Sequence, residues 1–225
     1  KGFRDLMEAC AEKGLLKAHV FFGPFLKRLK KVEEKNRTVL WQWAEGDSTK
    51  EYALDSISPH RVRGGHEIPA LLDCSTASDL YCNLISGISC ALRGIGKKGL
   101  LLLMDEAETI SRIEYSQYER RGWLFFEGLI GVAQKKREFM EIREEIYHNQ
   151  IRPVPYIYGN PSLLVIFTIT PLYGWDEYLR MKEMADTFFS LSPLSTPELS
   201  SLVAELINIY RSAYPDFKIG PDTER

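Results

Sequence analysis

Apolar positions at helical spacing alternate with extended apolar runs over the first third of the chain. Residues 3–13 carry apolar side chains three and four positions apart, which predicts a helix that ends at a glycine. The stretch LLKAHVFF at 15–22 predicts a strand closed by Gly23-Pro24, and the basic stretch FLKRLKKVEEKN at 25–36 predicts a short helix. Residues 37–75 combine glycine, proline and scattered charges, and we expect only loops and short helices there.

The rest of the chain contains two continuous apolar runs set among helical stretches. The runs Leu100–Met104 (LLLLM) and 163–170 (LLVIFTIT) are typical of strands buried on both faces of a parallel sheet. A short strand is predicted at 188–191. Helical spacing predicts helices at 77–92, at 111–149 as two helices broken near Gly128–Gly131, at 176–186, and from 196 to about 210 with Thr196 as N-cap.

This alternation of strands and helices is typical of an α/β fold. We expect a parallel, doubly wound sheet with right-handed crossovers. The α/β core is expected to span residues 1–192, and residues 193–225 are expected to begin a second, helical part.

Composition is that of an ordinary globular protein. The 225 residues are 44% hydrophobic, 12% aromatic and 27% charged, which excludes collagen-like, disordered and coiled-coil chains. The formal net charge is −2, so the sequence does not indicate a protein that binds nucleic acid mainly through electrostatic attraction. No apolar run approaches the roughly 20 residues of a bilayer span, and residues 1–12 do not resemble a signal peptide. A cytoplasmic protein without membrane contact is therefore expected.

The four cysteines and four histidines give little chemistry. No cysteine pair has C-x-x-C spacing, and four cysteines do not make a disulfide scaffold in a chain of this length. Cys82 and Cys90 are expected to be small core residues. His60 and His66 lie near Glu67, but no pair has a spacing usual for metal ligands, so no metal site is predicted there.

The acidic pair Asp105-Glu106 directly follows the first apolar strand. Residues just past the carboxyl end of a parallel strand line the crevice in which α/β proteins bind ligands. An aspartate there can hold Mg²⁺, and an adjacent glutamate can act on an attacking water. The alternative is an acidic helix N-cap, where carboxylates favour the helix dipole. Thr168 and Thr170 approach the end of the second strand, and one such hydroxyl is placed to bond a phosphate or the water.

Several stretches resemble one family of nucleotide-dependent enzymes. GKKGLLLLMDEAETI at 96–110 resembles the Walker B segment of AAA+ ATPases, and especially of the P-loop proteins of BREX phage defence (the BrxC and BrxD type). WQWAEGD at 41–47 and the strand ending in Thr170-Pro171 are similar to further parts of that family. LSPLSTPEL at 191–199 resembles the segment that leads into the AAA+ lid, so the resemblance covers about residues 1–212.

The resemblance implies a parallel P-loop NTPase sheet and an ATPase that remodels a DNA or protein partner. Its cofactors would be ATP and Mg²⁺. Asp105 would be the Mg²⁺ ligand, Glu106 the catalytic base and Thr170 the sensor, with all three residues contacting the bound nucleotide.

The chain departs from the family pattern at two places where the family contacts the phosphates of the nucleotide. No G-x-x-x-x-G-K-[ST] stretch occurs, and the nearest string, at 94–99, precedes a strand, so we interpret it as a turn. The family's Walker A loop would lie upstream of 3–13, and the chain is expected to begin just after it. Ala185-Asp186 stand where the family has an arginine, which leaves Arg180 as the candidate arginine finger ahead of Arg120 and Arg121.

Two hypotheses of function remain open. The chain is most of an AAA+ ATPase module, or it is a truncated or degenerate, catalytically inert AAA+ module that acts in protein interaction or assembly. Self-association is a possible partner interaction in either case. Because no phosphate loop is recognisable, we expect no appreciable ATP turnover by the isolated chain and at best weak nucleotide binding. A nuclease-like interpretation has little support, since no second carboxylate cluster has a suitable spacing.

Two structural expectations follow, the first from the two apolar runs, which both end in polar groups, and the second from the resemblance. The two apolar strands should be adjacent and parallel, with Asp105 and Thr170 on one edge of the sheet. An open strand edge needs a cover. The preferred cover is residues 188–191 paired with the second apolar strand, and the alternatives are a second copy of the chain or separation of the final segment.

Overall fold

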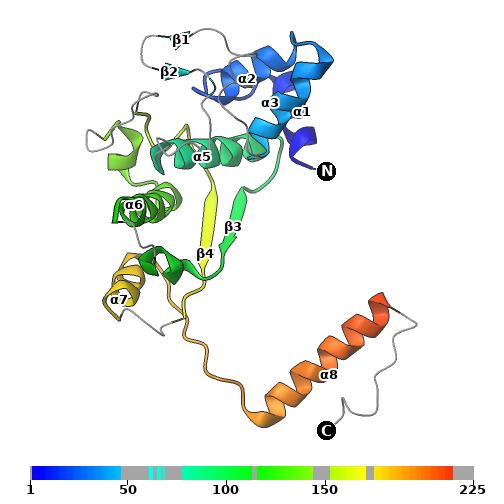
Figure 1. The fold of residues 1–225 in the computed structure, drawn as a ribbon, viewed down its shortest axis with the longest axis vertical. Coiled ribbons are helices and arrows are strands. Elements are labelled where there is room, and N and C mark those ends of the chain that lie inside the picture. Colours follow the sequence, from blue (N-terminus) through cyan, green and yellow to red (C-terminus); the bar gives the residue numbers. More distant parts are fainter. Residues whose placement is uncertain are drawn as a thin grey trace. The chain divides into compact units, whose positions relative to one another are not determined.

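The computed structural model describes residues 2–46, 61–62, 65–66, 68, 78–112, 116–143, 153–170 and 175–214. The chain divides into two units, Lys1–Ala185 and Asp186–Arg225. The first unit contains all of the described strands and every described helix except one, α8, which belongs to the second unit (Figure 1).

The N-terminal part of the first unit is helical: α1 (Phe3–Lys13), α2 (Phe22–Leu29) and α3 (Glu34–Ala44). The prediction of α1 is confirmed. The helix ends at Gly14, whose φ of 67° is the left-handed conformation that glycine adopts at helix ends. Three apolar side chains of α1 are buried in the core: Leu6, Met7 and Cys10.

The predicted strand at 15–22 is wrong, because residues 14–18 form turns and α2 begins at Phe22. The Nδ1 atom of His19 accepts hydrogen bonds from the backbone N–H groups of Phe21 and Phe22, at 3.1 and 3.2 Å. These bonds satisfy N–H groups at the start of α2, as a capping side chain does. Pro24 lies in the first turn, where its missing N–H costs no intrahelical bond.

The single helix predicted at 25–36 is also wrong. Two helices replace it, with a break at residues 30–33, and α3 extends into the region predicted to be irregular. The ring of Phe25 lies 5.5 Å from the ring of Trp41 and 5.7 Å from that of Trp43, and all three are buried. Tertiary burial of these aromatic rings therefore stabilises helices that local spacing does not indicate.

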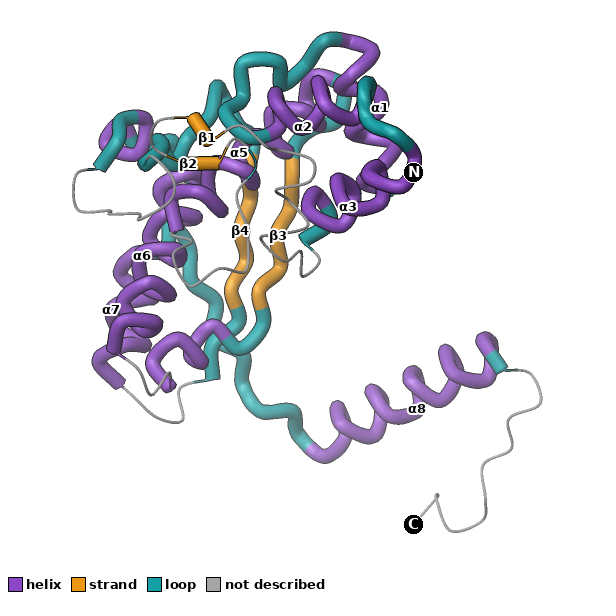
Figure 2. The backbone as a smooth tube through the Cα atoms, turned by 45° about the horizontal axis from the view of Figure 1, so that its top comes forward, coloured by secondary structure: helices purple, strands orange, loops and turns teal. Residues whose placement is uncertain are grey.

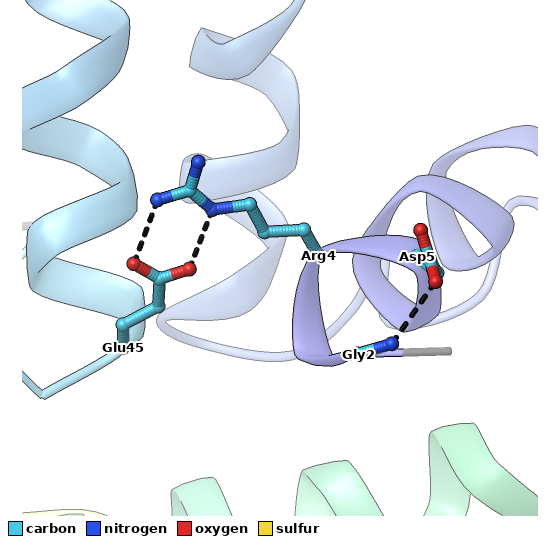
Figure 3. Close-up of polar contacts among 4 residues, drawn as sticks. All are labelled: Gly2, Arg4, Asp5 and Glu45. Carbon is cyan, nitrogen blue, oxygen red and sulfur yellow. Dashed lines mark hydrogen bonds and ion pairs between the residues drawn. The ribbon is translucent and has the colours of Figure 1, made fainter.

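An ion pair joins the first and third helices (Figure 3). Arg4 donates from Nε and Nη2 to the two carboxylate oxygens of Glu45, at 2.5 and 2.9 Å. This hydrogen bonding raises the pKa of Arg4 and lowers the pKa of Glu45. The guanidinium also lies 5.3 Å from the centre of the Trp41 ring. At the start of α1, the N–H of Gly2 donates to the carboxylate of Asp5 at 3.0 Å.

Two long helices pack on each other and against the sheet: α5 (Ser78–Gly94) and α6 (Ser116–Ala133) (Figure 1). The helix predicted at 77–92 is confirmed by α5. The predicted break near Gly128–Gly131 is wrong, because α6 runs through both glycines. A Cβ on Gly128 would lie 2.3 Å from Cε1 of Tyr156, and one on Gly131 would lie 2.5 Å from Cδ2 of Phe139. Both glycines therefore serve the close approach of an aromatic ring.

Two 3₁₀ helices flank α6: η1 (Ala107–Arg112) before it and η2 (Arg137–Met140) after it. The second of the two helices predicted within 111–149 is therefore not formed at 134–143, where a turn, η2 and irregular chain stand instead. Residues 144–149 of that prediction lie outside the described residues.

Two strands form the parallel sheet: β3 (Leu100–Met104) and β4 (Leu163–Phe167), which lie side by side in Figures 1 and 2. Their adjacency and direction confirm the prediction, with Leu100 opposite Leu163 and Met104 opposite Phe167. A second sheet consists of two short antiparallel strands, β1 (Arg61–Val62) and β2 (Gly65–His66). The fold class α/β is thus correct, and within the described residues the parallel sheet has two strands.

The prediction that both apolar strands are buried on both faces is wrong. Alternate side chains, such as Leu102 and Val165, pack against the core formed by α5, α6 and the segment before β4. The opposite face is exposed to the extent of 52% at Leu101, 71% at Leu103, 60% at Leu164 and 45% at Ile166. The described helices therefore cover one face of this sheet, whereas helices usually cover both faces of parallel sheets.

Helix α7 (Trp175–Met184) follows β4 and agrees with the helix predicted at 176–186. Its Met181 side chain is buried in a cluster with Ala107, Trp123 and Phe126. The strand predicted at 188–191 is wrong, because residues 185–195 contain no regular structure. The preferred cover for β4, pairing with 188–191, is therefore not formed.

The second unit contains α8 (Thr196–Ala213). The N-cap is Ser195, one residue before the predicted Thr196, and Pro197 lies at the start of the helix. The N–H and Oγ of Ser195 both contact Oε2 of Glu198, at 2.8 and 2.6 Å. This pairing of N-cap and N3 side chains is the signature of a helix start, and it lowers the pKa of Glu198.

Candidate functional site

The parallel pairing brings Asp105 and Thr168 together at the carboxyl edge of the sheet. Because Met104 lies opposite Phe167, the next residues leave the two strands side by side. Two backbone hydrogen bonds extend the pairing beyond the strands: the N–H of Thr168 donates to Met104 O at 2.9 Å, and the N–H of Ala107 donates to Thr168 O at 3.0 Å. The location is the one at which α/β sheets bind ligands.

Side-chain hydrogen bonds close the turn at this edge. The hydroxyl of Thr168 donates to Oδ1 of Asp105. The N–H of Glu106 donates to the same Oδ1 at 3.0 Å and to Oγ1 of Thr168 at 3.2 Å. All three residues are exposed. The edge thus exposes Asp105, Glu106 and Thr168 to solvent, with the side chains of Asp105 and Thr168 joined by a hydrogen bond.

The backbone of Glu106 has a φ of 54°, in the left-handed region that residues with a Cβ seldom adopt. Unusual backbone conformations of this kind are concentrated at ligand sites, where the surrounding bonds hold them. The helix that follows, η1, is a 3₁₀ helix of six residues. The acidic pair directly precedes this short helix, so the alternative interpretation as an acidic helix start also stays a prediction.

Thr170, the predicted sensor, lies two residues beyond Thr168 and is exposed. In the described parts of the chain, the threonine that contacts Asp105 is Thr168. Both threonines were expected near the edge, and the resemblance implied the sensor role for Thr170. The sensor assignment of Thr170 stays a prediction.

Arg180, the predicted arginine finger, is engaged with α6. Its Nη2 atom donates to Oε1 of Glu127 at 2.5 Å, and its guanidinium lies 4.2 Å from the centre of the Trp123 ring. These side chains line a cavity of about 360 Å³ together with Ser116, Glu119, Arg120 and Leu124. A finger acting on a neighbouring site would have to leave these contacts, so the role stays a prediction.

The glycine string at 94–99 lies at the opposite, amino end of β3, which confirms its interpretation as a turn. Gly96 has a φ of 87°, and the N–H of Lys97 donates to Leu92 O at 2.9 Å, which ends α5. A shallow cavity of about 260 Å³ is lined here by Lys98–Leu101 and Ser162–Leu164. Lys98 is therefore not part of the acidic edge.

The fit of Mg²⁺ to the acidic edge depends on the free oxygens. Oδ1 of Asp105 already accepts two hydrogen bonds, whereas the structure shows no such bond to Oδ2 from the described residues. Mg²⁺ is commonly held by one or two carboxylates, and waters and phosphate oxygens complete its coordination. The exposed carboxylate of Asp105 can supply one such protein ligand. A metal cage of three or more acidic, histidine or cysteine side chains does not occur in the described parts of the chain.

No family model, curated protein or solved structure matches this chain. The likeness to AAA+ ATPases therefore rests on the sequence motifs. Among the helices that the structure describes, none has the length and apolar character needed to cross a membrane.

A polar stripe on α5 positions β4, and the sequence analysis missed it. Asp79 accepts from the N–H of Val154 at 2.9 Å, and Nδ2 of Asn83 donates to Pro155 O at 2.8 Å. Oγ of Ser86 accepts from the N–H of Tyr158 at 2.9 Å, and Ser89 pairs with both backbone groups of Ser162. The signal was the recurrence of small polar residues at helical spacing within a buried helix. These bonds fix the segment 153–162 that leads into β4.

Proposed function

We propose that this chain is a nucleotide-dependent module of the AAA+ kind, which couples ATP binding and hydrolysis to the remodelling of a DNA or protein partner. The observation that carries this proposal is the Asp105–Thr168 contact at the carboxyl edge of two adjacent parallel strands. Bound Mg²⁺–ATP would supply the phosphoanhydride and the cation that neutralises charge developing on its phosphates.

Each residue of the edge has a distinct part in this proposal. Asp105 offers Oδ2 as the oxygen that meets the cation, because its Oδ1 is occupied by hydrogen bonds. Glu106 is exposed and extends from the adjacent position, where its carboxylate orients an attacking water and accepts its proton. Successive residues that leave a strand point in different directions, so the two carboxylates can serve these two parts separately.

A second candidate is an assembly module without catalysis, and the exposed apolar surfaces favour it. The uncovered sheet face carries Leu101, Leu103, Leu164 and Ile166. In the second unit, α8 also exposes apolar side chains at helical spacing: Leu199, Leu202, Leu206 and Ile209. Exposed apolar patches of this kind mark interaction surfaces.

Titration with Mg²⁺–ATP, followed by NMR of the backbone amides, tests the nucleotide proposal. We expect weak binding, in the millimolar range, with shifts at Asp105, Glu106 and Thr168. Asp105→Asn should abolish these shifts, while Glu106→Gln should keep them because it removes the base and leaves the cation ligand in place. Shifts that are unchanged in Asp105→Asn, or that arise elsewhere, would contradict the proposal and leave the assembly module.

A further inference from the structure

One residue, Thr168, contacts four successive residues, from the last residue of β3 into the turn that follows. Its backbone N–H and C=O bond Met104 and Ala107, and its hydroxyl bonds Asp105 and Glu106. The backbone bonds belong to the strand pairing and do not depend on the side chain. The hydroxyl therefore adds two hydrogen bonds that hold the Asp105-Glu106 peptide beside Thr168, between the two backbone bonds.

The hydroxyl has a single proton, and that proton is donated to Oδ1 of Asp105. One lone pair of the same oxygen accepts the N–H of Glu106 at 3.2 Å. While these bonds persist, Thr168 has no proton to donate to a phosphate. A threonine in this state orients its neighbours instead of contacting a ligand.

We infer that Thr168 is a positioning residue: its hydroxyl holds Asp105 so that only Oδ2 meets a divalent cation, and it holds Glu106 in its left-handed conformation. The inference rests on the proposed function, since it describes how the same edge is prepared for its cation. It differs from the role implied by the AAA+ resemblance, in which a hydroxyl at this strand end contacts the nucleotide.

The orientation matters because a carboxylate that is free to rotate must be ordered when the cation binds. Outer hydrogen-bonding partners of metal ligands reduce this cost, and their removal typically weakens metal binding by about 10- to 100-fold. At this edge, a valine at 168 would keep the size and branching of threonine and the backbone bonds to Met104 and Ala107. It would remove only the hydrogen bonds to Asp105 and Glu106.

The experiment compares Thr168→Val, Thr168→Ser and the control Thr38→Val, at an exposed threonine of α3, in the full chain by NMR. The first readout is hydrogen exchange of the Glu106 amide, with the Ala107 amide as an internal measure of folding. The second is the line broadening of these amides on addition of MnCl₂. We expect Thr168→Val to speed exchange at Glu106 and to weaken Mn²⁺ binding about tenfold. Thr168→Ser should restore both values, and Thr38→Val should change neither.

Three outcomes would count against these proposals in different ways. Unchanged exchange at Glu106 in Thr168→Val would refute the hydroxyl contact and the inference. Faster exchange with unchanged Mn²⁺ binding would reduce Thr168 to a structural role and also refute the inference, while leaving the proposed function. If Mn²⁺ fails to broaden these amides even in the unmodified chain, the cation site and with it the proposed function are refuted.

Discussion

At the scale of single residues, His19 shows how one buried polar side chain joins distant parts of the first unit. It is 1% exposed, and its ring lies 4.8 Å from that of Phe22 and 4.6 Å from that of Tyr158. Nδ1 accepts two backbone bonds at the start of α2, so the ring proton resides on Nε2, which donates to Asn83 O at 3.1 Å. Burial of this neutral ring lowers the pKa of His19 to about 4.

This lowered pKa predicts that the first unit loses stability in mild acid. The unfolded chain takes up the proton below its ordinary pKa of about 6.5, whereas the folded chain resists protonation until about pH 4. The contribution of His19 to the free energy of unfolding is therefore complete above pH 6.5 and is lost as the pH falls toward 4, by about 3 kcal/mol in all. Denaturant unfolding at several pH values between about 4 and 7.5 measures it.

The matched variant is His19→Asn, which keeps an acceptor near the amides of Phe21 and Phe22 but does not titrate. We expect it to be less stable than the natural chain at neutral pH and to show a smaller loss on acidification. An equal loss in both proteins would assign the pH dependence to other groups.

At the scale of elements, polar side chains of α5 are hydrogen-bonding partners for the backbone of the segment before β4, as a neighbouring strand would be. Ser86 illustrates this: its Oγ lies 2.9 Å from the N–H of Tyr158 and 3.2 Å from the carbonyl oxygen of Tyr156. Both contacts are with backbone, and Ser86 is buried. The packing of α5 is therefore specific in register, since moving the helix by one residue would leave the buried amide of Val154 and the partly buried amide of Tyr158 without partners.

We predict that Ser86→Ala destabilises the protein by about 1 kcal/mol, because it leaves the partly buried N–H of Tyr158 without its partner. Denaturant unfolding measures the loss, and hydrogen exchange should become faster at the Tyr158 amide. The control is Ser200→Ala on α8, whose hydroxyl is exposed and bonds the carbonyl of Thr196 within its own helix. That change should shift the free energy of unfolding by less than about 0.5 kcal/mol. Equal effects of the two changes would refute the structural role of the stripe.

At the scale of the whole molecule, the boundary at Ala185 and Asp186 separates two units of different character. The first unit buries large side chains from several elements, whereas α8 leaves most of its side chains exposed. Between α7 and α8, residues 185–195 have no regular structure. Their apolar side chains are also accessible, with Phe189 81% and Leu191 92% exposed.

Limited digestion with chymotrypsin should therefore cut first at Phe188, Phe189 or Leu191. An extended, exposed backbone fits a protease more readily than a helix or strand that is held by internal hydrogen bonds. Mass spectrometry of the earliest fragments identifies the site, and a chain with all three residues replaced by serine should be cut more slowly. Early cuts within α5 or α6 would show that the first unit is less stable than its packing indicates.

Local sequence patterns were sufficient to predict an element wherever residues close in sequence determine its conformation. Helix α1 with its terminal Gly14, the strand β3 and the start of α8 follow from spacing and capping, because those interactions act within a few residues. The predictions were wrong where residues distant in sequence determine the conformation. The hydrogen bonds of buried His19 support the start of α2 where the apolar run predicted a strand. The ring of Tyr156 packs against Gly128, so this glycine lies within α6 and does not end a helix.

The sequence by itself determined that two apolar runs form parallel strands and that an acidic pair stands at the end of the first. An apolar run followed by Asp-Glu carries this information locally. Only the tertiary structure decided that Thr168, and not Thr170, meets Asp105, and that one face of the sheet is uncovered. The physical reason is that strand register and burial depend on how distant segments pair with one another. Here the hydrogen bonds of α5 to residues 153–162 hold the segment before β4 in place, and neither strand contains those bonds.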